Sequence, residues 1–308
     1  MLSLQNKDII SVRDLKKEEI EIILEKTKEM EEVVNGGKVL DTMKGKVLAT
    51  LFFEPSTRTR LSFSTAMQRL GGSVIGFEGT QETSLAKGEN FTDTIRVVEK
   101  YCDVIVIRHP KEGAARFAAE ISSKPVINAG DGANQHPTQA LLDLYTIKKL
   151  KGNIENLNIT LFGDLKYGRV MKSIVYILAM FGANLTLVSP PGLEMSSEIV
   201  EEIKENFNAK IFQTNDPFSG IKKADILYVC RIQKERFPDP YEAEKIQKTF
   251  RITQEMLKEA KEDMIILHPL PKVTEIEYSI DNTKYAKYFD QVFYGVPVRM
   301  AILSLVCG

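Results

Sequence analysis

Short apolar, β-branched runs alternate with amphipathic stretches over most of the chain. The run Lys46–Thr50 is typical of a buried strand, and Thr57–Leu70 carries its apolar residues on one face of a helix. Pro55 ends the strand because it cannot donate to the ladder, and Ser56 is a favourable residue for the start of the helix. We therefore predict a strand, a tight turn and an exposed helix start in this part of the chain.

The same alternation continues to the C-terminus and predicts an α/β fold. Further strands are expected at 73–77, 103–107, 125–128, 159–162, 184–188, 210–212, 225–229 and 265–267. Further helices are expected at 12–34, 91–101, 112–121, 137–149, 169–181, 197–206 and 292–306. Alternating strands and helices imply parallel strands with right-handed crossovers. For 308 residues, this pattern predicts two doubly wound parallel-sheet domains joined by long helices, with one large α/β domain as the alternative.

Polar side chains follow several of the predicted strands directly. They are Thr57–Thr59, Arg108 and His136–Gln139. Ligands of parallel sheets bind beyond the carboxyl ends of the strands. At the first of these places, free backbone N–H groups, hydroxyls and the Arg58 guanidinium would suit a phosphate, although the stretch is not a Walker loop. A capped surface helix with exposed arginines is the simpler alternative.

Each of the three histidines, His109, His136 and His268, precedes a proline. A single histidine is more often structural than catalytic. His136 differs from the other two because it opens a predicted helix and Gln139 follows one turn later. We therefore expect chemistry at His136 and structural roles for His109 and His268.

Two arginines of the second half, Arg169 and Arg231, also follow predicted strands. Surface arginines are usually only solvated. A pair at matching positions, with Gln233 nearby, would instead hold a dicarboxylate through bidentate hydrogen bonds.

Composition excludes some classes of partner. The net charge of −1 gives no reason to expect nucleic-acid binding or an anionic membrane surface. No apolar run approaches the roughly 20 residues of a membrane helix, and the first residues do not resemble a signal peptide. The cysteines Cys102, Cys230 and Cys307 lack metal-binding spacing, so we expect reduced thiols, a cytoplasmic location and neither metal nor cofactor.

The stretch Phe53–Arg60, Phe-Glu-Pro-Ser-Thr-Arg-Thr-Arg, resembles the carbamoyl-phosphate signature of the transcarbamoylase family. The resemblance covers nearly the whole chain, and later segments are similar to the aspartate branch of this family. Ornithine enzymes carry His-Cys-Leu-Pro where this chain has His268–Pro271, and an Asp-x-x-Asn loop where it has Asp164–Arg169. Arg169 would suit a second carboxylate and repel the ammonium group of ornithine.

The resemblance implies carbamoyl transfer from carbamoyl phosphate to L-aspartate, without a covalent enzyme intermediate. It implies a carbamoyl-phosphate-binding domain at 1–137 plus 290–308 and an aspartate-binding domain at 150–289, which we expect to close on the substrates. The implied carbamoyl-phosphate residues are Ser56, Thr57, Arg58, Thr59, Arg108, His136, Gln139, Leu270 and Pro271. Of these, the implied catalytic residues are Arg58, Thr59, Arg108 and His136. The implied aspartate residues are Lys87, Arg169, Arg231 and Gln233. Leu270 and Pro271 would act through their carbonyls and be joined by a cis bond, and Lys272 stands where an arginine is common.

The resemblance also implies partners. Ser84 and Lys87, in the polar loop Gly79–Asn90, would reach the active site of a neighbouring subunit, so the implied assembly is a homotrimer with shared sites. A separate zinc-containing regulatory chain is a further partner that the family allows. Two alternatives stay open: a transcarbamoylase acting on another amino acid such as ornithine, and a non-catalytic phosphate- or nucleotide-binding module. The second alternative predicts the loss of one polar cluster, yet all are present.

Overall fold

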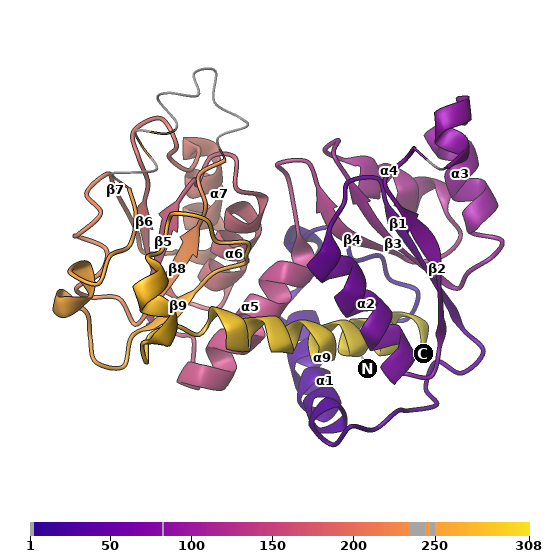
Figure 1. Cartoon of the computed structure of the whole chain (residues 1–308), viewed down its shortest axis with the longest axis horizontal. Helices are drawn as coiled ribbons and strands as arrows, with labels where there is room; N and C mark the ends of the chain where they lie inside the picture. Colours follow the sequence, from indigo (N-terminus) through magenta and orange to yellow (C-terminus); the bar gives the residue numbers. More distant parts are fainter. Residues whose placement is uncertain (1–2, 82, 234–243, 245, 247–249) are drawn as a thin grey trace. The chain divides into compact units, whose positions relative to one another are not determined.

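The computed structural model describes residues 3–81, 83–233, 244, 246 and 250–308. The chain divides into two compact units, unit 1 with Met1–Tyr145 and Phe293–Gly308 and unit 2 with Thr146–Val292. Each unit contains one parallel sheet with helices (Figure 1). The prediction of two α/β domains with parallel sheets is confirmed.

The sheet of unit 1 has four strands in the order β2-β1-β3-β4. Their bounds are β1 (Val47–Phe52), β2 (Ser73–Glu78), β3 (Val104–His109) and β4 (Val126–Asp131). All neighbouring pairs are parallel, and Phe52 at the end of β1 is in register with Arg108 of β3. The central strands are buried on both faces, as expected of a parallel sheet with helices on each side.

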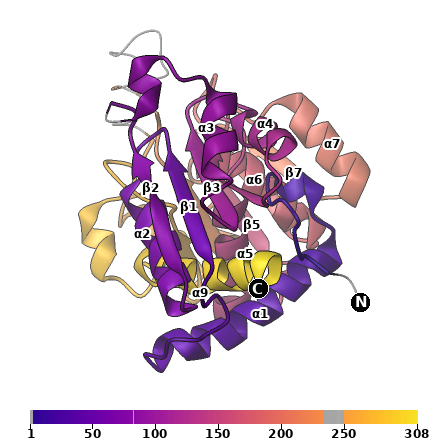
Figure 2. The same ribbon diagram turned by 90° about the vertical axis from the view of Figure 1, so that its right-hand side faces the viewer.

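Helices cover both faces of this sheet (Figure 2). They include α1 (Lys17–Asn35), α2 (Thr57–Arg69), α3 (Phe91–Val98) and α4 (Ala114–Ile121). Ala49 and Ile105 share one apolar cluster with Ile95 of α3 and Ala118 of α4. Successive residues of a strand point to alternate faces of the sheet. The residues next to Ala49 in β1 and next to Ile105 in β3 therefore point to the opposite face.

The sheet of unit 2 has five parallel strands in the order β7-β6-β5-β8-β9. Their bounds are β5 (Asn158–Gly163), β6 (Asn184–Val188), β7 (Ile211–Thr214), β8 (Ile226–Cys230) and β9 (Ile265–Leu267). Helices α6 (Arg169–Met180) and α7 (Ser197–Phe207) lie within unit 2, whereas α5 (Pro137–Lys151) and α9 (Tyr288–Cys307) have residues in both units. The division between the units falls within α5 and within α9.

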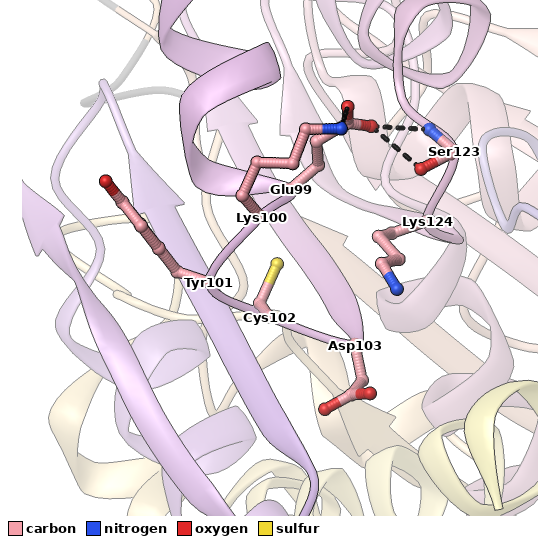
Figure 3. Close-up of a pocket in the computed structure, with 7 residues that line it drawn as sticks. All are labelled: Glu99, Lys100, Tyr101, Cys102, Asp103, Ser123 and Lys124. Carbon is pink, nitrogen blue, oxygen red and sulfur yellow. Dashed lines mark hydrogen bonds and ion pairs between the residues drawn. The ribbon is translucent and has the colours of Figure 1, made fainter.

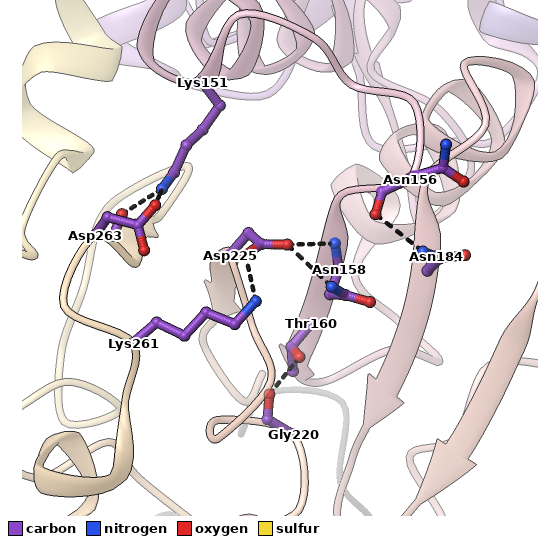
Figure 4. Close-up of polar contacts among 9 residues, drawn as sticks. All are labelled: Lys151, Asn156, Asn158, Thr160, Asn184, Gly220, Asp225, Lys261 and Asp263. Atoms are coloured by element: carbon purple, nitrogen blue, oxygen red, sulfur yellow. Dashed lines mark hydrogen bonds and ion pairs between the residues drawn. The ribbon is translucent and has the colours of Figure 1, made fainter.

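Polar contacts fix the amino ends of the unit 2 strands (Figure 4). Asp225, just before β8, accepts hydrogen bonds from the backbone and side-chain nitrogens of Asn158 at 2.8 and 3.1 Å. Lys261 pairs with the other carboxylate oxygen of Asp225. The Lys261 contact and these hydrogen bonds lower the pKa of Asp225 despite the opposing effect of burial. These contacts align β5 with β8 at the amino ends of the two strands.

Helix α9 is long and apolar enough to cross a membrane by length and composition alone. However, 61% of its apolar window is buried inside the structure, which is typical of the core helix of a folded domain. Tyr288, Val298 and Leu303 of this helix are completely buried.

Several element bounds differ from those predicted. The expected helix 12–34 is divided into the 3-10 turn Val12–Asp14 and α1, and the helix expected to reach residue 101 ends at Val98. Arg108 was expected to follow its strand but lies within β3. The loop Gly79–Asn90 was expected to lack periodic structure but contains the short 3-10 helix Ser84–Lys87. Hydrophobic periodicity does not mark such single turns, which depend on local hydrogen bonds.

Candidate functional site

Each sheet contains one point at which the strand order reverses. In unit 1 this point lies between β1 and β3, and in unit 2 it lies between β5 and β8. The carboxyl ends of the strands at such a point form the usual ligand site of a doubly wound sheet. Thr57 and Arg108 mark this place in unit 1, and Arg169 and Arg231 mark it in unit 2.

Helix α2 begins at Thr57, directly after the turn that ends β1, and Ser56 is its N-cap residue. The Ser56 side chain makes no capping hydrogen bond, although the sequence favoured it as a cap. Its backbone N–H instead donates to Glu78 at 2.8 Å, and Glu78 also pairs with Arg60 at 3.2 Å. Thr59 is buried in the first turn of the helix. The helix dipole and these polar groups make the turn a suitable place for an anion.

Arg108 lies at the end of β3 with its side chain only 11% exposed. Its Nη2 atom lies 3.2 Å from Glu54 Oε1, and its Nη1 atom donates to the Ala129 carbonyl at 3.3 Å. The Phe53 backbone N–H donates to the Arg108 carbonyl at 2.9 Å. These contacts hold the Arg108 guanidinium near the carboxyl end of β1.

His136 is buried directly before α5, whose first residue is Pro137. The preceding loop is organised by the buried carboxylate of Asp131. It accepts hydrogen bonds from the side chains of Asn128 and Asn134 and from the backbone of Gly113 and Gln135, at 2.8 to 3.0 Å. This network fixes the path of the chain into His136.

In unit 2, the buried carboxylate of Asp164 links the two segments that carry the arginines. It accepts from the Tyr167 backbone at 2.9 Å and from the Gln233 backbone at 3.4 Å. Arg169 is the first residue of α6, and Arg231 directly follows β8. Both arginines and Gln233 are partly buried.

Two glycines are required by the close approach of these segments. A Cβ atom on Gly163, which has a φ of +121°, would lie 2.1 Å from the Cys230 carbonyl oxygen. A Cβ atom on Gly168 would lie 2.5 Å from the Asp164 carbonyl oxygen. Both distances are shorter than any normal contact, so larger residues would displace the turn before Arg169.

The Leu270–Pro271 bond is cis, as the resemblance implied. Leu270 has a φ of +57°, an uncommon conformation for a residue other than glycine. Its backbone N–H donates to His268 Nδ1 at 2.8 Å. Since Nδ1 accepts, the proton of the neutral His268 ring is on Nε2, which lies 2.8 Å from Glu275 Oε1. His268 and Glu275 therefore support the Leu270–Pro271 turn.

Lys272 follows this turn and its side chain is only 7% exposed. Its Nζ atom lies 3.0 Å from Asp281 Oδ1 and 4.0 Å from the centre of the Tyr278 ring. The ammonium group of lysine is a point charge and lacks the planar fork with which a guanidinium can bind a carboxylate through two parallel hydrogen bonds.

Five predicted site residues are exposed to solvent in the single chain: Thr57, Arg58, Ser84, Lys87 and Pro271. Ser84 and Lys87 lie on the 3-10 helix after β2. His109, in contrast, is packed against Phe53 and Phe91, with ring centres 4.9 and 5.4 Å apart. Burial is the main cause that lowers the pKa of His109, and its Nδ1 accepts from the Lys111 backbone. These contacts agree with a structural role for His109.

A hollow in unit 1 lies at the amino ends of β3 and β4 (Figure 3). Its lining residues are Glu99–Asp103, just before β3, and Ser123–Lys124, just before β4. Glu99 accepts from the Ser123 backbone and hydroxyl at 2.7 and 3.0 Å. This hollow is thus at the amino ends of the strands, away from Arg108 and His136. Within the described part of the chain, no group of three or more His, Cys, Asp or Glu side chains could hold a metal ion.

Sequence reasoning missed the acidic residues that hold the basic and polar site residues. Glu54 contacts Arg108, Asp164 joins the two arginine segments, and Asp143 accepts from Gln139. Only the last relationship had a sequence signal, because residues four apart lie on the same face of a helix.

Two family models match the chain. Residues 7–149 match the aspartate/ornithine carbamoyltransferase carbamoyl-P binding domain. Residues 155–306 match the Asp/Orn binding domain of the same family.

Similar proteins extend over nearly the whole chain. The aspartate carbamoyltransferase catalytic subunit of Thermococcus kodakarensis is 56% identical over 99% of this chain and 98% of its own. The catalytic subunit of M. jannaschii aspartate transcarbamoylase has a TM-score of 0.89 and 51% identity, covering 97% of each chain. The Trypanosoma cruzi enzyme in complex with N-(phosphonacetyl)-L-aspartic acid has a TM-score of 0.94 and 36% identity, covering 99% of this chain and 97% of its own.

Proposed function

The chain belongs to the aspartate/ornithine carbamoyltransferase family, and we propose how its own residues perform the reaction of the aspartate-specific members. The chain transfers the carbamoyl group of carbamoyl phosphate to the amino group of L-aspartate. The products are N-carbamoyl-L-aspartate and phosphate, and the reaction belongs to pyrimidine biosynthesis. One observation supports the assignment of roles most strongly: basic residues lie at the carboxyl ends of the strands on both sides of each reversal of strand order.

Unit 1 binds the phosphate of carbamoyl phosphate. The binding groups are the first turn of α2, with Ser56, Thr57, Arg58 and Thr59, together with Arg108. Free N–H groups at a helix start, hydroxyls and guanidinium groups are all donors to a dianion. The Glu54 contact keeps the Arg108 guanidinium close to this turn before the phosphate arrives.

Hydrogen-bond donors bind the carbonyl oxygen of the carbamoyl group, and hydrogen-bond acceptors bind its NH₂ group. Thr59, Arg108 and His136 donate toward its carbonyl oxygen and stabilise the negative charge that develops there. The Gln139 side chain and the backbone carbonyls of Leu270 and Pro271 accept from its NH₂ group. Donors placed in advance at a developing oxyanion are usually the largest single contribution to this type of catalysis.

L-Aspartate is held by Arg169, Arg231 and Gln233 of unit 2. Each guanidinium can bind one carboxylate through two parallel hydrogen bonds. Asp164 supports this arrangement because it hydrogen-bonds to both segments. The same two positive charges repel the side-chain ammonium of ornithine, which is the alternative substrate within the family.

The chemical step needs no covalent intermediate. The uncharged amino group of aspartate attacks the carbonyl carbon, and the bond from that carbon to the phosphate oxygen breaks. The phosphate leaves with the electron pair and takes the proton that the nitrogen loses. Arg58 acts mainly in the transition state, where charge grows on the departing phosphate.

The proposed assembly is a homotrimer in which Ser84 and Lys87 complete the active site of a neighbouring subunit. The exposure of both residues in the single chain supports it. So do the edge position of β2 and the exposed apolar side chains of Leu61 and Ile75, which are 58% and 40% accessible. Ile75 belongs to the edge strand β2 and Leu61 to helix α2, and exposed apolar side chains beside an unpaired strand are typical of a surface that another chain covers.

A separate zinc-containing regulatory chain is a further proposed partner, since relatives are described as catalytic subunits. A cytoplasmic location is also proposed. The free and buried state of Cys102, Cys230 and Cys307 supports it, because reduced thiols are the rule in the cytoplasm.

The activity is tested by incubating the protein with carbamoyl phosphate and either L-aspartate or L-ornithine and measuring both carbamoylated products. The expected result is carbamoyl-aspartate alone. Turnover of ornithine would contradict the roles of Arg169 and Arg231 and leave the phosphate site of unit 1 intact. Turnover of neither amino acid, at a concentration at which trimers form, would favour a binding module.

A further inference from the structure

Gln139 and Asp143 form a hydrogen-bonded pair on one face of α5. The Gln139 Nε2 atom donates to Asp143 Oδ1 at 2.8 Å. Asp143 has 0% exposure, whereas Gln139 is partly buried and lies one turn after His136. The pair therefore joins a residue of the substrate site to a carboxylate in the interior of unit 1.

The carboxylate determines which end of the Gln139 amide faces the substrate. An ionised carboxylate accepts hydrogen bonds and donates none. In the opposite rotamer, the Gln139 carbonyl oxygen would face Asp143, and the two acceptors would repel each other. The buried Asp143 Oδ1 would also lose the hydrogen bond from Gln139 Nε2. Only the observed orientation satisfies both groups, and it directs Gln139 Oε1 away from Asp143.

A buried arginine of the same unit interacts electrostatically with the carboxylate of Asp143. Arg299 of α9 is 4% exposed and donates to Ser62 Oγ at 2.8 Å and to Thr138 Oγ1 at 3.5 Å. Burial lowers the pKa of Arg299 to about 10, against the opposing effect of the negative charge of Asp143, so the guanidinium stays protonated at neutral pH. A buried carboxylate near a buried guanidinium is far more favourable than either charge alone.

We propose that Asp143 is a positioning residue that fixes Gln139 as a hydrogen-bond acceptor and so makes the site select carbamoyl phosphate over acetyl phosphate. This inference rests on the proposed role of Gln139 toward the NH₂ group of the substrate. Acetyl phosphate has a methyl group in place of that NH₂ group. In the native site this methyl group would leave the Gln139 carbonyl oxygen without a donor, which is the strongest means by which an enzyme rejects an analogue.

The test compares kcat/KM for carbamoyl phosphate and for acetyl phosphate, each with L-aspartate. Asp143→Asn keeps the size of the side chain but allows either rotamer of Gln139, because an amide can donate as well as accept. The ratio of the two kcat/KM values should fall roughly tenfold or more in Asp143→Asn, as expected for the loss of one well-placed hydrogen bond. Gln139→Leu should reduce the ratio at least as much.

Glu99→Gln is the matched control. Glu99 is also a buried carboxylate of unit 1 that accepts hydrogen bonds, but it lies at the amino ends of the strands (Figure 3). This variant should lose stability without any change in the ratio. A general loss of packing in unit 1 would lower both kcat/KM values together and leave the ratio unchanged.

The outcomes separate this inference from the proposed function. If Gln139→Leu lowers the ratio and Asp143→Asn does not, Asp143 does not position Gln139 and the inference is overturned, while the proposed function stands. If neither variant changes the ratio, the role of Gln139 is wrong and the inference fails with it. Turnover of L-aspartate by the unaltered protein would still support the activity itself.

A measurement on the unaltered protein covers the case in which Asp143→Asn does not fold. A neutron structure with phosphonoacetamide, a stable analogue that carries the same amide group, would locate the amide deuterons of Gln139. One of them should point to Asp143 Oδ1, with Oε1 toward the analogue. Deuterons that point toward the analogue would overturn the proposal.

Discussion

Arg108 and Glu54 form an ion pair at the carboxyl ends of two neighbouring strands, with Arg108 Nη2 3.2 Å from Glu54 Oε1. The register of β1 and β3 produces this contact, because Phe52 is aligned with Arg108 and Glu54 follows two residues later. The carboxylate positions the guanidinium, but it also competes with any phosphate that approaches.

Removing the charge of Glu54 should therefore strengthen phosphate binding. In Glu54→Gln, the Kd for inorganic phosphate should fall up to about fivefold, since a partly exposed charge contact contributes at most about 1 kcal/mol. Isothermal titration calorimetry measures this Kd directly. Glu120→Gln makes the same charge change on the exposed surface of unit 1 and should have little effect. An unchanged Kd in Glu54→Gln would show that phosphate does not compete for Arg108.

Arg58→Ala should lower kcat about 100- to 1,000-fold with little change in substrate binding, because its guanidinium acts on charge that grows in the transition state. Steady-state kinetics together with the Kd of carbamoyl phosphate separate the two effects. Arg60→Ala is the control, since Arg60 belongs to the same helix turn but pairs with Glu78. A rise in KM at unchanged kcat would contradict the catalytic role of Arg58.

Arg169→Met should raise the KM for L-aspartate roughly 10- to 100-fold and leave the Kd of carbamoyl phosphate unchanged. The reason is that a charge-assisted hydrogen bond contributes about 1.5 to 3 kcal/mol. Lys166→Ala removes a positive charge from the same loop, where the side chain is exposed, and should change the KM little. Equal effects of both variants would indicate general electrostatic attraction in place of a specific carboxylate site.

Glu275 should contribute to acid sensitivity. Hydrogen bonds from His268 and the Val273 backbone lower its pKa from the ordinary value of 4.5, although burial acts in the opposite direction. Because the pKa is lower in the folded protein than in the unfolded chain, the carboxylate stabilises the fold above pH 4.5, and this contribution is lost as the pH falls through the folded pKa.

Glu275→Gln should therefore reduce stability at neutral pH and flatten its decline in acid. Thermal unfolding followed from neutral pH into this acid range measures both effects. Glu259→Gln is the control, because Glu259 pairs with Lys222 on the surface with 65% of its side chain exposed. An acid decline of unchanged steepness in Glu275→Gln would contradict the role of the His268 contact.

Shared active sites predict complementation between subunits. Lys87→Ala and Arg58→Ala should each be inactive alone, but mixed trimers should regain part of the activity, because one site of each mixed assembly can receive both unaltered residues. Dissociation in mild denaturant, mixing and reassembly would be followed by an activity assay. Two copies of the same variant, treated in the same way, should stay inactive. Mixed trimers without activity would exclude sharing.

The sequence was sufficient for the fold class and for the polar groups at the strand ends. Parallel strands have a strong apolar signature, and their carboxyl ends can be located without knowledge of the sheet order. The position of Arg108 within β3 and its contact with Glu54 could not be predicted, since they depend on the register between two strands. The same limit applies to Glu275 and His268, which are seven residues apart in an irregular segment.

The most direct test of the proposed site is a crystal structure of this chain with N-(phosphonacetyl)-L-aspartate, which joins both substrates in one molecule. The phosphonate should contact the Ser56–Thr59 turn and Arg108, and the two carboxylates should contact Arg169 and Arg231. A phosphonate at the first turn of α2 with carboxylates bound to other residues would contradict the aspartate assignment. An analogue bound away from both groups of residues would contradict the account as a whole.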